Sequence, residues 1–368
     1  MSLYKLSERI FELEKQGNPI VKLNIGNPGL PTPPLLVQAA EKAIADGKTF
    51  YASGQGEKKL LEKIASMHQT EVKNTTVTPG SKWAIYGLMK ILLQPGDNIV
   101  TPGPFWSAFE LIAKNLGGSC KLVKTEAEDR WNFQLDDLFE TVNQKTKLII
   151  INSPLNPTST EYKPETLRAV YEYAQDKKIQ VLVDEAYRDL SFQHNNLTKY
   201  VEYVNVTNTF SKAYCMSGWR AGYLVASEEL TKKLVELNQI TFTNVPLFTQ
   251  AAMLSGLENR KSLTKATRDA CAGRLKLAEK IFSGIEYVKP DAGFYMFLKC
   301  PGKQNGGHRA GGDGNKVAES ALEKGVAIVP GANFGGYDEW IRISLSHPEV
   351  TLKPALEKVR AAMDENAK

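Results

Sequence analysis

Short runs of consecutive apolar residues alternate with longer amphipathic stretches between about residues 75 and 226. The runs at 147–154 and 179–187 show no alternation of apolar and polar positions, which predicts strands that are buried on both faces. The stretches at 105–118 and 163–178 carry apolar residues at helical spacing and are bounded by Gly or Pro. This pattern predicts an α/β protein with a mainly parallel sheet covered on both sides by helices.

The pattern changes after residue 228, where the chain is predicted to be helical to about residue 282. Three short strand-like runs and a closing helix follow, with the runs at 293–300, 325–331 and 340–346. The Gly-rich segment 303–316 is predicted to be an exposed loop. We therefore expect a second, smaller α+β domain. The expected division is an N-terminal arm and helix that adds part of the small domain at 1–45, a large domain at 46–272 and a small C-terminal domain at 273–368.

Composition and charge exclude several classes of protein. Apolar residues make up 42% and charged residues 24% of the 368 positions, which favours a large core over disorder. The net charge is only +5 and the lysines are dispersed, so we expect no nucleic-acid partner. No apolar run approaches the length of a membrane span, and the first 17 residues lack the apolar segment of a signal peptide. We therefore expect no membrane partner and a cytoplasmic location.

The cysteines and histidines show no spacing typical of metal ligands or disulfides. The cysteines are far apart and contain no CxxC pair: Cys120, Cys215, Cys271 and Cys300. The histidines fit no metal-ligand pattern either, so no metal site is expected. Reduced, mostly buried thiols are the better interpretation.

Polar residues follow several predicted strands directly, and ligands of parallel sheets bind at the carboxyl ends of their strands. Asp184 follows the apolar run VLV, and Asn156 lies in a Pro-flanked turn after IIIN. Each also has an ordinary structural interpretation, as a helix-capping aspartate or a turn asparagine. Lys212 follows VNVTNTFS. A lysine at a buried strand end is costly as a free ammonium group but not as a neutral imine.

A possible anion site precedes another predicted helix. Gly80, Ser81 and Lys82 come directly after a strand, and small residues that begin a helix offer backbone N–H groups to a phosphate. Arg220 is a further cation in the otherwise quiet run 210–223. A lysine for a Schiff base, a carboxylate for a pyridine nitrogen and an anion cradle are together what pyridoxal 5'-phosphate requires.

These motifs occur in the order and at the spacing of the class I aminotransferase family of fold type I pyridoxal-phosphate enzymes. The chain resembles the prokaryotic aspartate aminotransferases of that family over nearly its whole length. The resemblance is carried by GNPGLPTPP (26–34), TFYASGQGEKKLLEKIA (49–65), TPGSKWAI (78–85), NSPLNPT (152–158), DEAY (184–187), FSKAYCMSGWRAGY (210–223), PDAGFYMF (290–297), GVAIVPGANFG (325–335) and IRISLS (341–346). It implies transfer of an amino group between an L-amino acid and a 2-oxo acid by a ping-pong route.

The resemblance also implies roles for single residues. Lys212 would form the Schiff base and then move the proton between the substrate Cα and the cofactor C4′. Asp184 would keep the ring nitrogen protonated, and Tyr187 and Asn156 would hydrogen-bond the 3′ oxygen. Trp106 would stack on the ring, and its alternative is a core aromatic residue.

Further implied contacts concern the phosphate and the substrate. The phosphate would be bound by the amides of Gly80, Ser81 and Lys82, by Thr209 and Arg220, and by Tyr51 from a second subunit. That last contact implies a homodimer. Arg342 would bind the substrate α-carboxylate in the bidentate geometry that arginine offers. Gly26, with Asn156 beside it, would let this carboxylate approach the backbone.

Two motifs depart from the family pattern near the expected site. The NPTG turn ends in Ser159 instead of glycine, which we expect to alter the turn without removing the preceding asparagine. The acidic positions of the GEPD loop are occupied by Asn27 and Gly29. Because this loop commonly lines the substrate entrance, its chemistry has changed.

A third departure leaves the substrate open. Acid-specific members carry a Ser/Thr pair ahead of the first helix, and those positions fall on Met1 and Leu3. Lys82 remains as a partner for a distal carboxylate or as a phosphate neighbour, so both aspartate-type and broad or aromatic specificity are compatible with the sequence. Two alternative functions are a pyridoxal-phosphate lyase or oxidase on the same fold and, less favoured, a non-catalytic pyridoxal-phosphate-binding protein.

Overall fold

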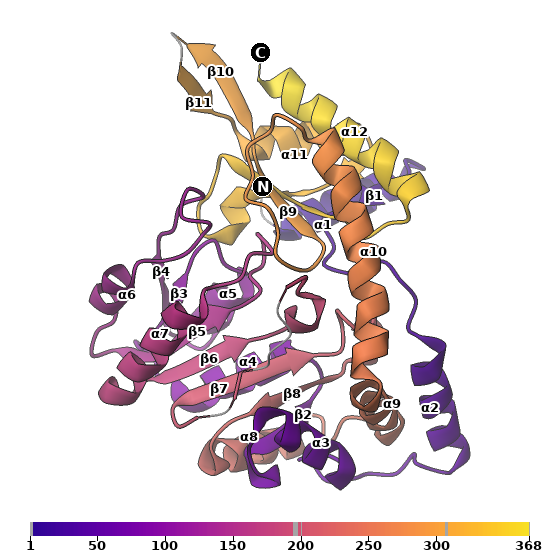
Figure 1. The fold of residues 1–368 in the computed structure, drawn as a ribbon, viewed down its shortest axis with the longest axis vertical. Helices are drawn as coiled ribbons and strands as arrows, with labels where there is room; N and C mark the ends of the chain where they lie inside the picture. The colour runs from indigo at the N-terminus through magenta and orange to yellow at the C-terminus, as the bar shows by residue number, and fades with distance from the viewer. Residues whose placement is uncertain (1–2, 194–197, 200, 306–307, 368) are drawn as a thin grey trace.

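A seven-stranded sheet forms the centre of the computed structural model, which describes residues 3–193, 198–199, 201–305 and 308–367 (Figure 1). The strand order is β2 (Thr75–Thr78), β8 (Gly222–Val225), β7 (Val204–Thr209), β6 (Gln180–Asp184), β5 (Thr146–Asn152), β3 (Asn98–Pro102) and β4 (Ser119–Val123). The pairs from β7 through β4 are parallel, and β8 is antiparallel to both of its neighbours. The predicted mainly parallel sheet is therefore confirmed.

Helices cover both faces of this sheet, as the unbroken apolar strands predict. Ile150 of β5 packs into a cluster with α4 (Ser81–Leu92), α5 (Ala108–Asn115) and α8 (Glu228–Thr241). Its neighbours Ile149 and Ile151 pack on the other side, with α6 (Leu135–Thr141) and α7 (Pro164–Lys177). Successive side chains of a strand point to opposite faces, so this run of isoleucines contributes to two separate cores.

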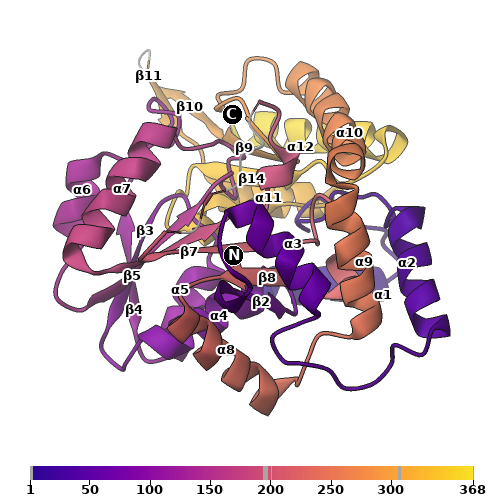
Figure 2. The ribbon, with the colours of Figure 1, turned by 60° about the horizontal axis from the view of Figure 1, so that its bottom comes forward.

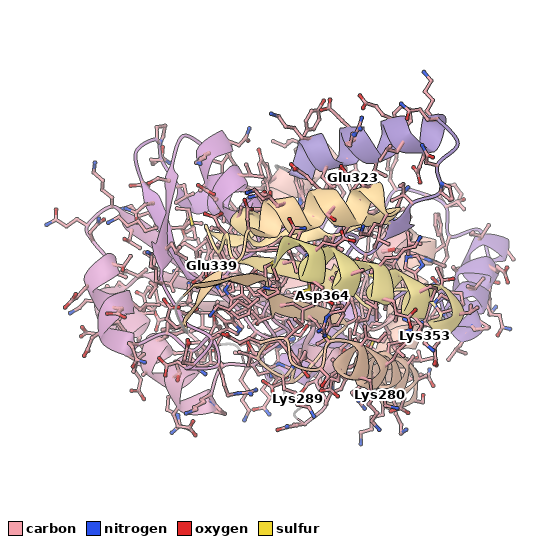
Figure 3. The ribbon with its side chains drawn as sticks, turned by 90° about the horizontal axis from the view of Figure 1, so that it is seen from above. Lys280, Lys289, Glu323, Glu339, Lys353 and Asp364 are labelled. Carbon is pink, nitrogen blue, oxygen red and sulfur yellow. The ribbon has the colours of Figure 1, made fainter. Side chains whose placement is uncertain are left out.

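The C-terminal third of the chain forms a second, smaller structure above this sheet (Figure 1). Its antiparallel sheet contains β13 (Val329–Pro330), β14 (Trp340–Ser344) and β9 (Tyr295–Lys299). The helix α11 (Gly314–Glu323) packs on this sheet, and α12 (Glu349–Asn366) packs against α11. Figure 3 shows α12 on the outside, where its charged Lys353 and Asp364 are exposed.

One prediction for this part was wrong. The Gly-rich segment at 303–316 was expected to be a loop, but much of it pairs in the hairpin of β10 (Pro301–Asn305) and β11 (His308–Gly311), and α11 begins within it. Backbone pairing needs no apolar side chains, so the polar composition concealed these strands.

The N-terminal segment contacts both parts of the molecule. Leu6 and Ile10 of α1 (Leu3–Lys15) pack with Leu322 of α11, and β1 (Val21–Lys22) pairs with β12 (Val326–Ala327). In contrast, α2 (Pro34–Ala45) packs against α9 (Leu247–Glu258) beside the large sheet, as Figure 2 shows at its right.

The long helix α10 (Arg260–Ile281) connects the two parts of the structure (Figure 1). The expected boundary between residues 272 and 273 falls inside this helix, and the three-domain division stays a prediction.

The remaining short elements are α3 (Lys58–His68) and the 3-10 turns η1 (Val72–Asn74), η2 (Arg188–Leu190), η3 (Ser217–Trp219) and η4 (Gly331–Phe334). Within the described residues, none of these helices is long and apolar enough to cross a membrane.

Candidate active site

The carboxyl ends of β5, β6 and β7 open into a cavity of about 560 Å³ that also reaches the small sheet. The structure brings most of the predicted site residues together in its lining. These are Gly26, Ser81, Lys82, Trp106, Asn156, Asp184, Tyr187, Thr209, Lys212, Arg220 and Arg342. The segments involved lie far apart in the sequence and meet where parallel strands end, which is the expected position of a ligand site.

Lys212 lies in the turn that follows β7 and extends its side chain into the cavity. Its Nζ donates a hydrogen bond to the Gly26 carbonyl oxygen at 2.5 Å and lies 5.7 Å from the centre of the Tyr187 ring. A Cβ at Gly26 would lie 3.5 Å from this Nζ and 2.1 Å from the Tyr295 hydroxyl oxygen. Glycine at position 26 is thus required by packing, in addition to the substrate access that the resemblance implies.

Asp184 is the last residue of β6 and its side chain is buried. One carboxylate oxygen accepts a hydrogen bond from the Ala186 N–H at 3.1 Å. Burial raises the pKa of this carboxyl to about 7, although the Ala186 N–H and the charge of Lys212 act in the opposite direction. Burial thus disfavours the charged form of the Asp184 carboxyl. A protonated pyridine nitrogen beside it would stabilise the carboxylate, and pyridoxal phosphate offers this partner.

An anion cradle lies at the N-terminus of α4. Gly80 precedes the helix with φ of +85°, and no side chain caps the helix. The Arg220 guanidinium approaches so closely that a Cβ at Gly80 would lie 2.5 Å from its Nη2, and this Nη2 donates to the Pro79 carbonyl at 3.0 Å. Thr209 adds its hydroxyl to the same cavity. Uncapped N–H groups beside a guanidinium suit a phosphate.

Arg342 of β14 is a buried cation that has no counter-ion within the described ranges. Its Nη1 donates to Asn156 Oδ1 at 3.0 Å and its Nη2 to the Asn24 carbonyl at 2.6 Å. Its Nε is buried and has no hydrogen-bond partner among the described residues, and none of the ion pairs found there involves Arg342. An unpaired buried charge is strongly unfavourable, so an anionic group of a ligand would stabilise this side chain.

The cavity as a whole is cationic, and its residues fit pyridoxal phosphate together with a carboxylate substrate. Lys82, Lys212, Arg220 and Arg342 line it, whereas Asp184 is the only acidic residue in the lining formed by the part of the chain that the structure describes. Partial burial and the charges of Arg220 and Lys212 lower the pKa of Lys82. Phosphate and carboxylate groups would relieve this repulsion between cations.

Tyr51 is the predicted residue that stands apart from this cavity. It lies in the segment after α2 with 88% of its surface exposed, and it is not among the residues that line the cavity. Trp106 lines the cavity, and its ring lies edge-on to the ring of Phe109, with 5.6 Å between the two ring centres.

Several lining residues received no role from the sequence: Asn24, Asn152, Ala186, Ser211, Ser217, Tyr295 and Phe334. Asn152 Nδ2 donates to the Asp184 carbonyl at 2.9 Å, and its Oδ1 accepts from the Asn156 N–H at 2.8 Å. It therefore fixes two strand ends relative to each other. Its position at the end of an apolar run was a signal that could have identified it.

The comparisons with known proteins agree with this geometry. Residues 18–359 match the family described as aminotransferase class I and II. The aspartate aminotransferase of Thermococcus kodakarensis is 31% identical over 369 residues, covering 100% of this chain and 95% of that protein. A probable aspartate/prephenate aminotransferase of Aquifex aeolicus is 32% identical, with 96% and 93% covered. The solved aspartate aminotransferase from Thermus thermophilus with maleate has a TM-score of 0.88 at 28% identity and covers 98% of this chain and 96% of that chain.

Proposed function

The chain belongs to the class I and II aminotransferase family and has its fold type I architecture, and we propose that its amino donors include acidic L-amino acids that bind through Lys82. As a member of this family it is an aminotransferase that uses pyridoxal phosphate. It exchanges an amino group between an L-amino acid and a 2-oxo acid by a ping-pong mechanism.

The chemical step is assigned to Lys212, Asp184 and Tyr187. When bound, pyridoxal phosphate supplies an electron sink for the charge left at the substrate Cα. Lys212 Nζ would be the group that carries a proton between the substrate Cα and the cofactor C4′. Asp184 would pair with the ring nitrogen and keep it protonated. Tyr187, with Asn156, would donate a hydrogen bond to the 3′ oxygen of the ring.

Arg342 is assigned to the α-carboxylate of the substrate. The Asn156 side chain and the Asn24 carbonyl already bond its two terminal nitrogens, so the guanidinium is oriented before any substrate enters. The aromatic faces of Tyr295 and Phe334 lie 4.4 and 5.1 Å from its central carbon. Such preorganisation lowers the entropic cost of binding.

The observation that carries the acidic specificity is the position of Lys82. Its Nζ lies 4.9 Å from the centre of the Trp106 ring, in the lining of the cavity, and no ion pair involves it among the described residues. The similar Thermus thermophilus structure was solved with maleate, a dicarboxylate. Of the two positions that acid-specific members fill with Ser/Thr, Met1 lies outside the described residues and Leu3 is the first residue of α1. Lys82 would therefore bind the distal carboxylate without that pair.

Replacing Lys82 with methionine is expected to reduce kcat/KM for L-aspartate by about 10- to 100-fold, the effect of losing one hydrogen bond between charged groups. The value for L-phenylalanine should stay within about threefold, because this substrate has no distal carboxylate. Steady-state kinetics at saturating 2-oxoglutarate would measure both. Lys90→Met, on the exposed side of the same helix, is the matched control. Equal losses for the two donors would show that Lys82 serves the cofactor phosphate instead.

A homodimer with Tyr51 contributed across the interface is also proposed. Phe50 and Tyr51 are 78% and 88% exposed, and Ile240 at the end of α8 is 81% exposed. A hydrogen bond of 3.2 Å from the Ala52 N–H to Asn244 Oδ1 connects the segment after Tyr51 to the segment that follows α8. Large exposed apolar side chains gathered in one region favour burial against another protein surface, and a second copy would bring Tyr51 to the anion cradle.

Hybrid dimers would test this arrangement. Tyr51→Ala and Lys212→Ala chains are each expected to be nearly inactive alone, and the purified hybrid dimer should recover up to about half of wild-type activity, because one of its two sites keeps both native residues. The measurement is activity of the separately tagged, co-purified hybrid. Sedimentation would confirm that it contains two chains. A hybrid with no recovered activity would contradict a Tyr51 that acts across the interface.

A cytoplasmic location stays a prediction. The four cysteines are free thiols in the structure, with Cys120 half-buried and the others buried. Burial raises the pKa of the Cys271 and Cys300 thiols to about 12. Such unpaired, unreactive thiols suit a reducing compartment.

A further inference from the structure

Tyr295 contacts three groups of the candidate site, although no sequence motif assigned it a role. It is the first residue of β9, only 2% exposed, and lines the cavity. Its hydroxyl lies 3.1 Å from the Tyr187 hydroxyl, and its ring centre is 4.4 Å from the guanidinium carbon of Arg342. It is also the side chain that a Cβ at Gly26 would displace.

We propose that Tyr295 is a positioning residue that serves two groups at once: its hydroxyl orients the hydroxyl of Tyr187 toward the cofactor, and its ring supports the guanidinium of Arg342. The inference rests on the roles proposed above for Tyr187 and Arg342. It goes beyond them because it couples the cofactor side of the site to the substrate side through one residue.

The hydroxyl pair has a defined direction when the cofactor is bound. A tyrosine hydroxyl has one proton and two acceptor lone pairs. If Tyr187 donates its proton to the 3′ oxygen of the ring, the hydroxyl of Tyr295 must be the donor in their mutual hydrogen bond. Burial is the main cause that raises the pKa of Tyr187 well above its usual value, and the neighbouring Tyr295 adds to this rise. Tyr187 therefore stays protonated and remains a donor at neutral pH.

The stacking on Arg342 follows from the register of the small sheet. β14 and β9 are antiparallel, with Arg342 opposite Phe297 and Ser344 opposite Tyr295. Tyr295 is therefore a diagonal neighbour of Arg342 on the same face of the sheet, a spacing that long and aromatic side chains can bridge. A cation over an aromatic face in a buried site is stabilised by the ring quadrupole. The ring thereby holds the guanidinium against the Asn156 side.

Two substitutions separate the two roles. Tyr295→Phe removes only the hydroxyl, so we expect the pKa of the bound cofactor to rise by roughly 1. This pKa is measured from the visible absorbance of the enzyme without substrate as the pH is varied. The rise is expected because a less well oriented Tyr187 donates a weaker hydrogen bond and leaves the 3′ oxygen more basic. Tyr295→Leu removes the ring as well and should also weaken binding of the unreactive carboxylates maleate and 3-phenylpropionate by about 3- to 10-fold. Tyr295→Phe should bind both within about twofold.

The control is Tyr162→Phe, which removes another buried hydroxyl that has no hydrogen-bond partner among the described residues and lies outside the cavity lining. It should change neither measurement, and thermal unfolding of every variant would identify a general loss of stability. An unchanged cofactor titration in Tyr295→Phe would overturn the hydroxyl role, and carboxylate binding equal in the Leu and Phe variants would overturn the ring role. Tyr187→Phe, titrated in parallel, shows whether a failure concerns Tyr295 alone or the role proposed for Tyr187. Binding of 3-phenylpropionate without maleate would contradict only the acidic specificity.

Discussion

Replacing Lys212 with alanine is expected to remove the visible absorbance of the cofactor that is covalently linked to the enzyme. It is also expected to lower kcat by roughly 10⁴-fold or more. Two functions are lost together. Lys212 Nζ lies 5.7 Å from the centre of the Tyr187 ring, in the cavity that Asp184 also lines, and we propose that it is both the attachment point and the proton carrier. The absorbance of the purified protein and a single-turnover assay with L-aspartate would measure the two losses separately.

The Lys212 variant needs a control that keeps the fold and the cavity. Lys82→Met removes another ammonium group from the same lining and should retain the visible absorbance. Fluorescence titration with pyridoxal phosphate should show that the Lys212 variant still binds the cofactor non-covalently, because the Arg220 cradle and Asp184 remain. Wild-type-like turnover in Lys212→Ala would refute the assignment of this residue.

Replacing Arg342 with alanine should raise KM for amino-acid donors by about 10²-fold or more, the cost of truncating one partner of a buried charge pair. Affinity for the cofactor should change only a few-fold, because the Arg342 bonds go to Asn156 and Asn24 and not to the cradle. Arg342→Lys should recover part of the loss only, since an ammonium group cannot bind a carboxylate through two parallel hydrogen bonds. Steady-state kinetics and cofactor titration measure the two effects.

Arg360→Ala is the matched control for Arg342. Arg360 lies on α12, where it pairs with Asp364 at 3.0 Å and donates to the Ser283 carbonyl, and its loss should leave KM unchanged because it is not among the residues that line the cavity. A parallel fall in cofactor affinity and substrate affinity in Arg342→Ala would mean that the substitution disrupts the cavity and does not act through the carboxylate.

The central sheet and the polar residues at its strand ends could be predicted from the sequence for a physical reason. A strand buried on both faces must be apolar throughout, as Ile149, Ile150 and Ile151 are, and this pattern survives in any sequence with that fold. The polar residues that end such strands, Asp184 among them, are costly there unless a ligand uses them. For the predicted residues that do line the cavity, the expectation followed from these two rules and the family resemblance.

Contacts between segments that are distant in sequence could not be predicted in the same way. Gly29 was interpreted as a change in the chemistry of the substrate entrance. The structure instead shows φ of +66°, and a Cβ there would lie 1.5 Å from the Ser346 carbonyl oxygen. Arg274 of α10 bonds the carbonyls of Pro28, Gly29 and Leu345, which fastens this loop to the small sheet. No local pattern encodes a fit between backbones that the fold brings together.

Tyr295 illustrates the same limit within the site. The sequence places it correctly in a short strand, but alternation along a strand says only which residues share a face. That its ring would face Arg342 depends on the register between β9 and β14, and that its hydroxyl would reach Tyr187 depends on how the small sheet sits over the large one. Both are properties of the assembled fold.

A single-turnover spectral experiment would show whether this protein transfers the amino group of an acidic amino acid to its cofactor. The cofactor-loaded enzyme would be mixed with L-aspartate, L-phenylalanine and L-alanine in separate reactions, and 2-oxoglutarate would then be added to each. We expect L-aspartate to convert the cofactor to its aminated form, 2-oxoglutarate to reverse the change, and Lys82→Met to slow the reaction with L-aspartate selectively. Release of ammonia without an aminated cofactor, or conversion by L-phenylalanine alone, would contradict this expectation.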